Sequence, residues 1–210
     1  MSLMGLGAVA CAPATETGED EDDDGVNVNA QESDLTGCLP LGLGPQVSGP
    51  VEQKYLSLGG CRSFLGPPVH GTMATPDGKG GLYAAFINGS IYWRGDLGAH
   101  VVRGEIRELW KAYGWESGWL GYPITDETVL ADGGRFGVFE NGSIYWTRRT
   151  GAHSVRGPIR DKWASLDWER GPLGYPTTEE FPVPGGVQVN FQRGAIIWLR
   201  DTSGEVRATF

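Results

Sequence analysis

The sequence contains few of the residues and motifs that define several large protein classes. Its 210 residues include only three histidines and three cysteines, with no His-x-x-x-His or Cys-x-x-Cys spacing. We therefore expect neither a metal site nor a cofactor. No stretch approaches the roughly 18 apolar residues of a membrane-spanning helix. The Gly-x-Ser-x-Gly and phosphate-loop motifs are also absent, which leaves no common signature of a hydrolase or a nucleotide-binding enzyme.

A basic surface is absent as well. The chain has 26 acidic and 17 basic residues, and nine of the acids lie between Glu16 and Asp34, where Lys and Arg do not occur. The remaining 17 acids balance the 17 bases, so nothing in the charge favours nucleic acid binding. The acidic segment is also rich in Thr, Gly and Asn and cannot bury a core. Residues 11–37 are therefore predicted to form a disordered tether.

The N-terminus is short and apolar. Residues 1–10 end in small side chains, and Ala8-Val9-Ala10-Cys11 resembles the lipobox of bacterial lipoproteins. In that family the cysteine is lipid-modified and becomes the N-terminal residue after cleavage. The resemblance implies a signal-like segment, a lipid anchor at Cys11 that reaches a membrane, and a place in the cell envelope or secretion. The alternative is an apolar N-terminus with a chance cysteine.

Two cysteines remain once Cys11 is set aside. An even number is typical of an oxidising compartment, and a Cys38–Cys61 bridge would close a loop of 22 intervening residues. Chain entropy gives such a bridge about 3 kcal/mol of stabilisation. Two free thiols are the alternative.

Internal repeats are the strongest signal in the sequence. Asn88-Gly89-Ser90-Ile91-Tyr92-Trp93 recurs identically at residues 141–146 and more weakly at 193–198. Leu120-Gly121-Tyr122-Pro123 recurs at 173–176 and more weakly at 65–68. The period of 52 to 55 residues predicts one repeat domain over residues 38–210, with units at about 49–98, 104–151 and 157–203.

In these motifs the chain resembles the LGFP repeat family, which is named for its Leu-Gly-Phe-Pro tetrapeptide. The resemblance covers about residues 49–203. Tyr122 and Tyr175 replace the usual Phe, and Pro67 departs further. Members occur in bacterial cell-envelope proteins, sometimes fused to mycolyltransferases or peptidoglycan amidases. There the repeats are thought to attach proteins to wall polysaccharide, so the resemblance implies a non-catalytic binding role.

Each unit reads as a short helix followed by a β-hairpin, which is an α+β design. Residues 104–114 place Ile106, Leu109, Trp110 and Tyr113 on one helical face, and Gly114 is a fitting stop. Asn-Gly between β-rich runs predicts a hairpin whose two central residues have positive φ. One such unit cannot bury its own apolar face. We expect the three units to close into a ring with pseudo-threefold symmetry, with a linear solenoid as the alternative.

Aromatic residues are the first candidates for a site. Trp110 and Trp163, on the helix face, are predicted to lie in the core. The strand residues Trp93 and Trp146 are either core or sugar-stacking platforms. Tyr92 and Tyr145 point to the opposite strand face and are expected to be more exposed. Tyr92, Tyr145 and Trp119 are the predicted stacking residues.

Polar candidates come from repeated positions. His100 and His153 either fix the turn between units through backbone hydrogen bonds, contact a ligand, or bind a metal with a carboxylate. Asp126 and Glu127 either form turns or contact sugar hydroxyls; adjacent acids do not provide the opposed pair that glycoside hydrolysis needs. We predict ligand hydrogen bonds from these four residues.

Three functions follow from these observations. The first is a non-enzymatic module that binds envelope glycan at shallow sites repeated along the array. The second is a scaffold that binds an envelope protein and has no glycan affinity, which predicts one contiguous exposed apolar patch. The third is a hydrolase, for which the sequence offers no convincing acid–base pair.

Overall fold

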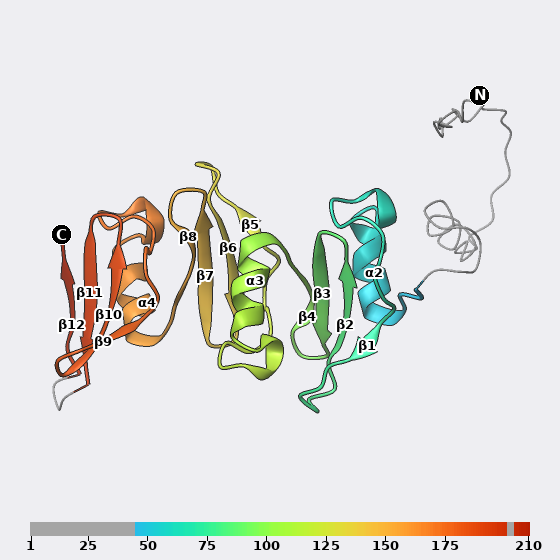
Figure 1. The fold of residues 1–210 in the computed structure, drawn as a ribbon, viewed down its shortest axis with the longest axis horizontal. Helices are drawn as coiled ribbons and strands as arrows, with labels where there is room; N and C mark the ends of the chain where they lie inside the picture. Colours follow the sequence, from blue (N-terminus) through green and yellow to red (C-terminus); the bar gives the residue numbers. More distant parts are fainter. Residues whose placement is uncertain (1–44, 201–203) are drawn as a thin grey trace, which may run out of the picture.

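The computed structural model describes residues 45–200 and 204–210, which form three units of one design (Figure 1). Each unit has an α-helix, a one-turn 3-10 helix and a four-stranded antiparallel sheet, so the α+β class is confirmed. The first unit contains α2 (Gly49–Ser57), η1 (Gly60–Arg62), β1 (Met73–Ala74), β2 (Leu82–Phe86), β3 (Gly89–Arg94) and β4 (Gly98–Val102). The second contains α3 (Gly104–Ala112), η2 (Trp115–Ser117), β5 (Thr128–Val129), β6 (Arg135–Phe139), β7 (Gly142–Thr147) and β8 (Gly151–Val155). The third contains α4 (Gly157–Ala164), η3 (Trp168–Arg170), β9 (Phe181–Val183), β10 (Gly186–Phe191), β11 (Gly194–Leu199) and β12 (Val206–Thr209).

The predicted helix faces are confirmed. In α3, Ile106 and Trp110 are buried, and the chain leaves the helix through Gly114 at a φ of 91°. Trp110 and its equivalent Trp163 have no exposed surface, so both are core residues. The indole N–H of Trp110 donates to the carbonyl oxygen of Gly121 at 3.0 Å. This bond ties the helix to the Leu-Gly-Tyr-Pro turn that follows it.

The predicted hairpins are present, but the turn type is not the predicted one. Phe139 pairs with Gly142, so Glu140 and Asn141 form the two-residue loop, and neither Asn141 nor Gly142 has a positive φ. The Asn-Gly pair has a different role. The Asn141 side chain donates to the carbonyl oxygen of Trp119 at 3.0 Å, and a Cβ on Gly142 would lie 2.8 Å from the carbonyl oxygen of Val155. The motif therefore ties the hairpin to its neighbours instead of bending it.

The three units form a row and not a ring (Figure 1). The described residues bury three separate cores, and each core joins a helix to the sheet of its own unit. Tyr92 of the first sheet packs in the second core, and Tyr145 of the second sheet packs in the third. The first and second sheets therefore pack on their own helix with one face and on the next unit with the other. The expectation of a closed ring with pseudo-threefold symmetry was wrong, because the outer face of the third sheet lies at the end of the row and not against the first unit (Figure 1).

The outer face of the third sheet differs in composition. Gln188 and Ile197 form a cross-strand pair there, where the second sheet has the pair of Phe136 and Tyr145. This sheet lies at the end of the row (Figure 1). A cross-strand pair of aromatic residues thus occupies this position only in the two sheets that a following unit covers.

The predicted segments 1–10 and 11–37 lie outside the described residues, as do Cys11 and Cys38. Cys61 lies in η1 and packs against the first core. The lipid anchor, the tether and the Cys38–Cys61 bridge therefore stay predictions. Every helix that the structure describes is too short or too polar to cross a lipid bilayer.

Candidate ligand-binding site

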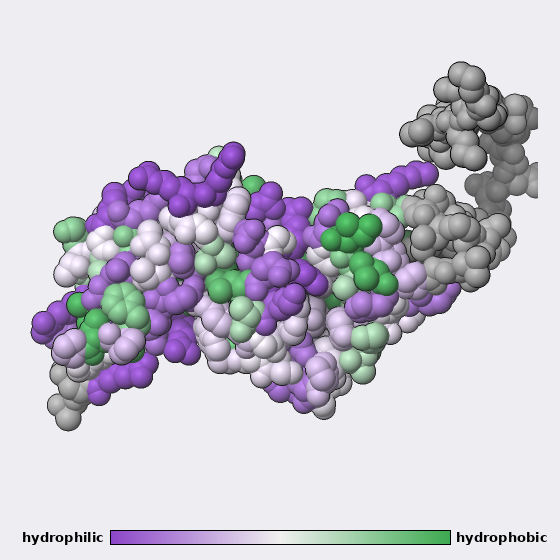
Figure 2. All heavy atoms as spheres, viewed as in Figure 1, coloured by the Kyte–Doolittle hydropathy of each residue, from purple (hydrophilic) through white to green (hydrophobic). Residues whose placement is uncertain are grey.

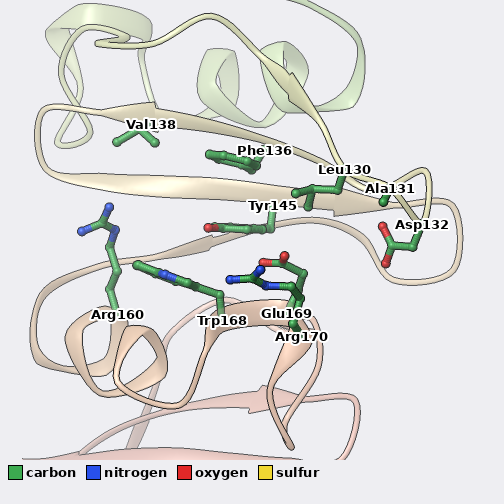
Figure 3. A pocket seen from close by; sticks show the side chains of 10 residues that line it. All are labelled: Leu130, Ala131, Asp132, Phe136, Val138, Tyr145, Arg160, Trp168, Glu169 and Arg170. Carbon is green, nitrogen blue, oxygen red and sulfur yellow. The ribbon is translucent and has the colours of Figure 1, made fainter.

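Two pockets occupy equivalent places at the two junctions between units. The larger, of about 560 Å³, lies between the second sheet and the turn after α4 (Figure 3). The smaller, of about 220 Å³, lies between the first sheet and the turn after α3. Six lining positions are shared, and they are Tyr83, Ala85, Tyr92, Arg107, Trp115 and Glu116 in the smaller pocket and Phe136, Val138, Tyr145, Arg160, Trp168 and Glu169 in the larger. The repeat thus builds the same cavity twice.

Stacked aromatic rings form one wall of each pocket. In the larger pocket the Tyr145 ring lies between Phe136, at a centroid distance of 5.1 Å, and Trp168, at 6.3 Å (Figure 3). In the smaller pocket Tyr92 lies at the same distances from Tyr83 and Trp115. Planes within about 25° of parallel make this wall flat and stiff.

An unusual backbone conformation places the indole in each stack. Trp115 and Trp168 have φ values of 58° and 53°, a left-handed conformation that side chains other than Gly seldom adopt. Such a conformation costs about 1 kcal/mol or more, which the packing of the ring against Tyr92 or Tyr145 offsets. The tight turn beyond it needs Gly118 and Gly171, where a Cβ would lie 1.8 Å and 1.7 Å from a backbone carbonyl oxygen.

A guanidinium group covers the same indole in both pockets. Arg160 lies 5.2 Å above the Trp168 ring, and its Nε donates to Ser143 Oγ at 2.9 Å. Arg107 lies 5.0 Å above Trp115 and donates to Ser90 Oγ at 2.8 Å. Arg107 also donates from Nη1 to Glu108 at 3.0 Å. Because hydrogen bonds fix each guanidinium, its remaining N–H groups keep a defined direction.

A carboxylate completes each pocket. Glu116 is 2 % exposed, and burial, helped by the nearby charge of Asp77, raises the pKa of its carboxyl. Its carboxylate accepts from the Ser117 hydroxyl at a long 3.4 Å. Glu169 is half-buried at the equivalent place. Each pocket therefore combines an apolar wall, hydrogen-bond donors and hydrogen-bond acceptors.

The structure brings Tyr92 and Tyr145 to these pockets, but not as exposed platforms. Each is 5 % exposed, and burial raises the pKa of each phenol. Alternation along the strand does place them on the face opposite Ile91 and Ile144. The expected exposure is wrong because the next unit covers that face.

His100 and His153 lie outside both pockets. Their Nε2 atoms lie 2.8 Å and 2.9 Å from the carbonyl oxygens of Leu97 and Thr150, three residues earlier. This is the turn-fixing geometry among the three alternatives. A hydrogen bond with the Glu179 carboxylate, 3.2 Å from Nδ1, raises the pKa of His153.

Asp126 and Glu127 make contacts within the protein. Asp126 accepts from Lys54 Nζ at 2.5 Å and from the backbone N–H of Val101 at 2.9 Å. These bonds and the one from His100 outweigh burial and lower the pKa of Asp126. Glu127 accepts from Arg103 at 3.2 Å and Arg135 at 2.8 Å. Both carboxylates join neighbouring units, and Glu127 also lines a separate cavity of about 250 Å³ with Trp146.

Trp119 also lies away from the junction pockets. Its ring packs on Tyr113 at 5.1 Å, and the guanidinium of Arg156 lies 4.6 Å from its centre. Of the predicted ligand-binding residues, then, the two tyrosines share equivalent pockets, and the other five lie elsewhere.

The arginines, indoles and glutamates of the pockets were not predicted, although the sequence carries a signal for them. Arg107, Trp115 and Glu116 recur as Arg160, Trp168 and Glu169, whereas the corresponding places in the first unit hold Glu52, Gly60 and Cys61. No described sheet precedes the first unit. The arginine, tryptophan and glutamate therefore recur only in units that pack on a preceding sheet, and this pattern indicates that they belong to the junction between units.

Neither a metal centre nor a catalytic arrangement is evident among the residues that the structure describes. They contain no cluster of three His, Cys, Asp or Glu side chains that could hold a metal ion. The larger pocket has two carboxylates, Glu169 and Asp132 (Figure 3), but Asp132 already accepts from the Tyr175 hydroxyl at 2.8 Å and from the backbone N–H of Gly134 at 3.0 Å. What the pockets offer is recognition chemistry.

The comparisons with known proteins agree with the repeat pattern. The family model described as LGFP repeat matches residues 65–118, 120–171 and 173–209, which is more than half of the chain. Each matched stretch begins at the Leu-Gly-x-Pro turn, and the first two end beyond the next helix. None of the curated proteins compared with the chain matches it.

Proposed function

Because this chain belongs to the LGFP repeat family, we propose that it is a non-catalytic binding module of the bacterial cell envelope. In this proposal the protein binds wall polysaccharide and serves as an anchor or adaptor. The observation that carries the proposal is the repeated junction pocket, with the same six positions at both junctions.

The pocket chemistry fits a sugar polymer. A flat, stiff aromatic wall suits the apolar faces of a pyranose or furanose ring. The guanidinium of Arg160 donates and the carboxylate of Glu169 accepts, so a ring hydroxyl finds both kinds of partner. Two weak sites on one molecule raise the effective affinity for a polymer. A lipid anchor at Cys11 would hold these sites close to the wall, at the envelope location that the proposal includes.

A binding assay on insoluble wall fractions tests the proposal. The full-length chain is mixed with wall material before and after protease treatment, and the bound fraction is measured. The matched variant carries Pro76→Trp and Ala131→Trp, two exposed residues that line the rims of the smaller and larger pocket. Lys111→Trp, on an exposed position of α3 that lines neither pocket, is the control.

We expect binding that survives protease treatment, is lost in the double variant and is unchanged in the control. Equal binding by the double variant and the control would remove the pockets from the proposal. Loss of binding after protease treatment would refute a glycan ligand.

One observation favours the second candidate, a scaffold for an envelope protein. Phe64, Val69 and Ile87 of the first unit are 45 %, 60 % and 65 % exposed, and Figure 2 shows hydrophobic side chains gathered on this unit. Ile87 and Val69 lie side by side, since their backbone N–H groups bond to Pro67 and Ala85. If this patch binds a protein, Ile87→Glu abolishes the protease-sensitive part of wall binding and leaves the protease-resistant part unchanged.

A further inference from the structure

The two junction pockets lie at opposite long edges of the row. The smaller one includes Pro76, in the β1–β2 connection, and the larger one includes Ala131 and Asp132, in the β5–β6 connection. Figure 1 places the β1–β2 connection at the lower edge and the β5–β6 connection at the upper edge. The turns that complete the pockets alternate likewise, since the end of α3 points down and the end of α4 points up (Figure 1).

This alternation follows from how consecutive units pack. α3 and α4 each lie between two sheets, and the helices of neighbouring units run in opposite directions across the row (Figure 1). A pocket forms where a helix ends, at its Trp-bearing turn. Consecutive pockets therefore open at alternating edges, although their lining residues are equivalent.

We infer that one molecule holds two separate polysaccharide strands, one at each edge, and so cross-bridges them. The inference rests on the proposed glycan function and adds the way in which the ligand is held. A strand that follows one edge reaches one pocket. The second unit, with α3 and its sheet, lies between the two pockets (Figure 1). The protein would then link two polymer strands instead of binding one strand at two sites.

The pockets are unequal, which fits two strands better than two consecutive segments of one. The larger pocket carries Phe136, Val138 and the exposed Arg170, whereas the smaller carries Tyr83, Ala85 and His70. Their common core of arginine, indole and glutamate selects the same class of ligand. The differing side chains tune the strength of each site independently.

Agglutination of wall fragments tests the inference. The probe is a suspension of sonicated, protease-treated wall fragments, and light scattering follows their cross-linking as the full-length chain is added. Bound protein is measured in parallel by sedimentation. The variants are Pro76→Trp, which blocks the smaller pocket, and Ala131→Trp, which blocks the larger, with Lys111→Trp as the control. Circular dichroism confirms that each variant is folded.

The expected result has two parts. The unmodified chain and the control increase scattering to a maximum and then lower it at excess protein, when every strand is saturated. Each single-pocket variant still sediments with the fragments, at reduced capacity, but does not increase scattering.

Two results would overturn the inference and leave the proposed function standing. One is binding by the unmodified chain without agglutination at any ratio, which would mean that both pockets engage one strand. The other is full agglutination by either single-pocket variant, which would mean that self-association links the fragments. If neither the unmodified chain nor the control binds the fragments, the proposed function fails, and the cross-bridge fails with it.

Discussion

The hydroxyl of Tyr122 provides a sharp test of how the units are joined. It lies 2.7 Å from Thr75 Oγ1 and donates to Asp77 Oδ1 at 2.9 Å, across the junction with the first sheet. Gly81 makes room for it, since a Cβ there would lie 2.3 Å from the phenol oxygen. Tyr122→Phe restores the Phe of the family motif and removes only this oxygen.

The substitution should lower the free energy of unfolding by about 2 kcal/mol, because a hydrogen bond to a charged group contributes about 1.5–3 kcal/mol. The Asp77 side chain is 5 % exposed, so water cannot replace the lost donor. Asp77 keeps the Thr75 hydroxyl at 3.0 Å and the Lys79 N–H at 3.2 Å, which limits the loss.

A matched substitution at the next junction supplies the control. The Tyr175 hydroxyl donates to Asp132 at 2.8 Å, but Asp132 is exposed. Water can take the place of the phenol there, and Tyr175→Phe should cost less than about 1 kcal/mol. Urea unfolding at neutral pH measures the stability of both variants. A shift of the unfolding midpoint with an unchanged m-value gives the change in the free energy of unfolding.

The cost at Tyr122 should also depend on pH. Burial raises the pKa of Asp77, but hydrogen bonds from Tyr122, Lys79 and Thr75 outweigh it and hold the pKa below the ordinary 3.8. A lowered folded-state pKa stabilises the protein above 3.8, and this contribution is lost as the pH falls through the folded-state value. The difference between Tyr122→Phe and the unmodified chain should therefore shrink in acid. Equal costs for the two tyrosines, or a cost independent of pH, would refute this account of the junction.

Two further predictions concern other parts of the row. Glu179→Gln should lower the pKa of His153, because the carboxylate hydrogen bond is the main cause of its raised value, and NMR titration of the imidazole measures it. A raised histidine pKa stabilises the fold fully below about pH 6.5 and loses this effect as the pH rises through the folded-state pKa, so unfolding of the unmodified chain should show that window and the variant should not. Gly118→Ala should destabilise by about 1–3 kcal/mol or more, because its Cβ would overlap the carbonyl oxygen of Tyr113. The exposed Gly95→Ala should change the melting temperature little, and similar shifts for the two would contradict the packing argument.

Local structure was predictable from the sequence because short-range patterns determine it. The face of Ile106 and Trp110 and the stop at Gly114 identify α3, and the repeated Asn-Gly pair identifies the first two hairpins. The outer strands were not predicted. β5 has two residues, and the Gly151–Val155 strand contains a His and a Ser that give no clear alternation.

The arrangement of the units could not be derived in the same way. Strand alternation shows that Tyr92 and Ile91 point to opposite faces, and both are apolar, so both faces of the sheet are buried. The pattern does not say what covers the second face. A ring and a row satisfy it equally. The third sheet decides between them, because its outer face lies at the end of the row and not against the first unit (Figure 1). The pockets escaped prediction for the same reason, since their two walls come from different units.

The middle unit is the one described unit that carries both halves of a junction. Its helix and Trp115 turn fit onto the sheet before it, and its sheet, with Phe136 and Tyr145, receives the turn that follows. A tandem duplication of residues 104–156 would therefore join to itself through a surface that already exists, and each duplication would add one pocket on the edge opposite the last. Gene duplication could in this way change the number of binding sites in steps of one without the evolution of any new interface.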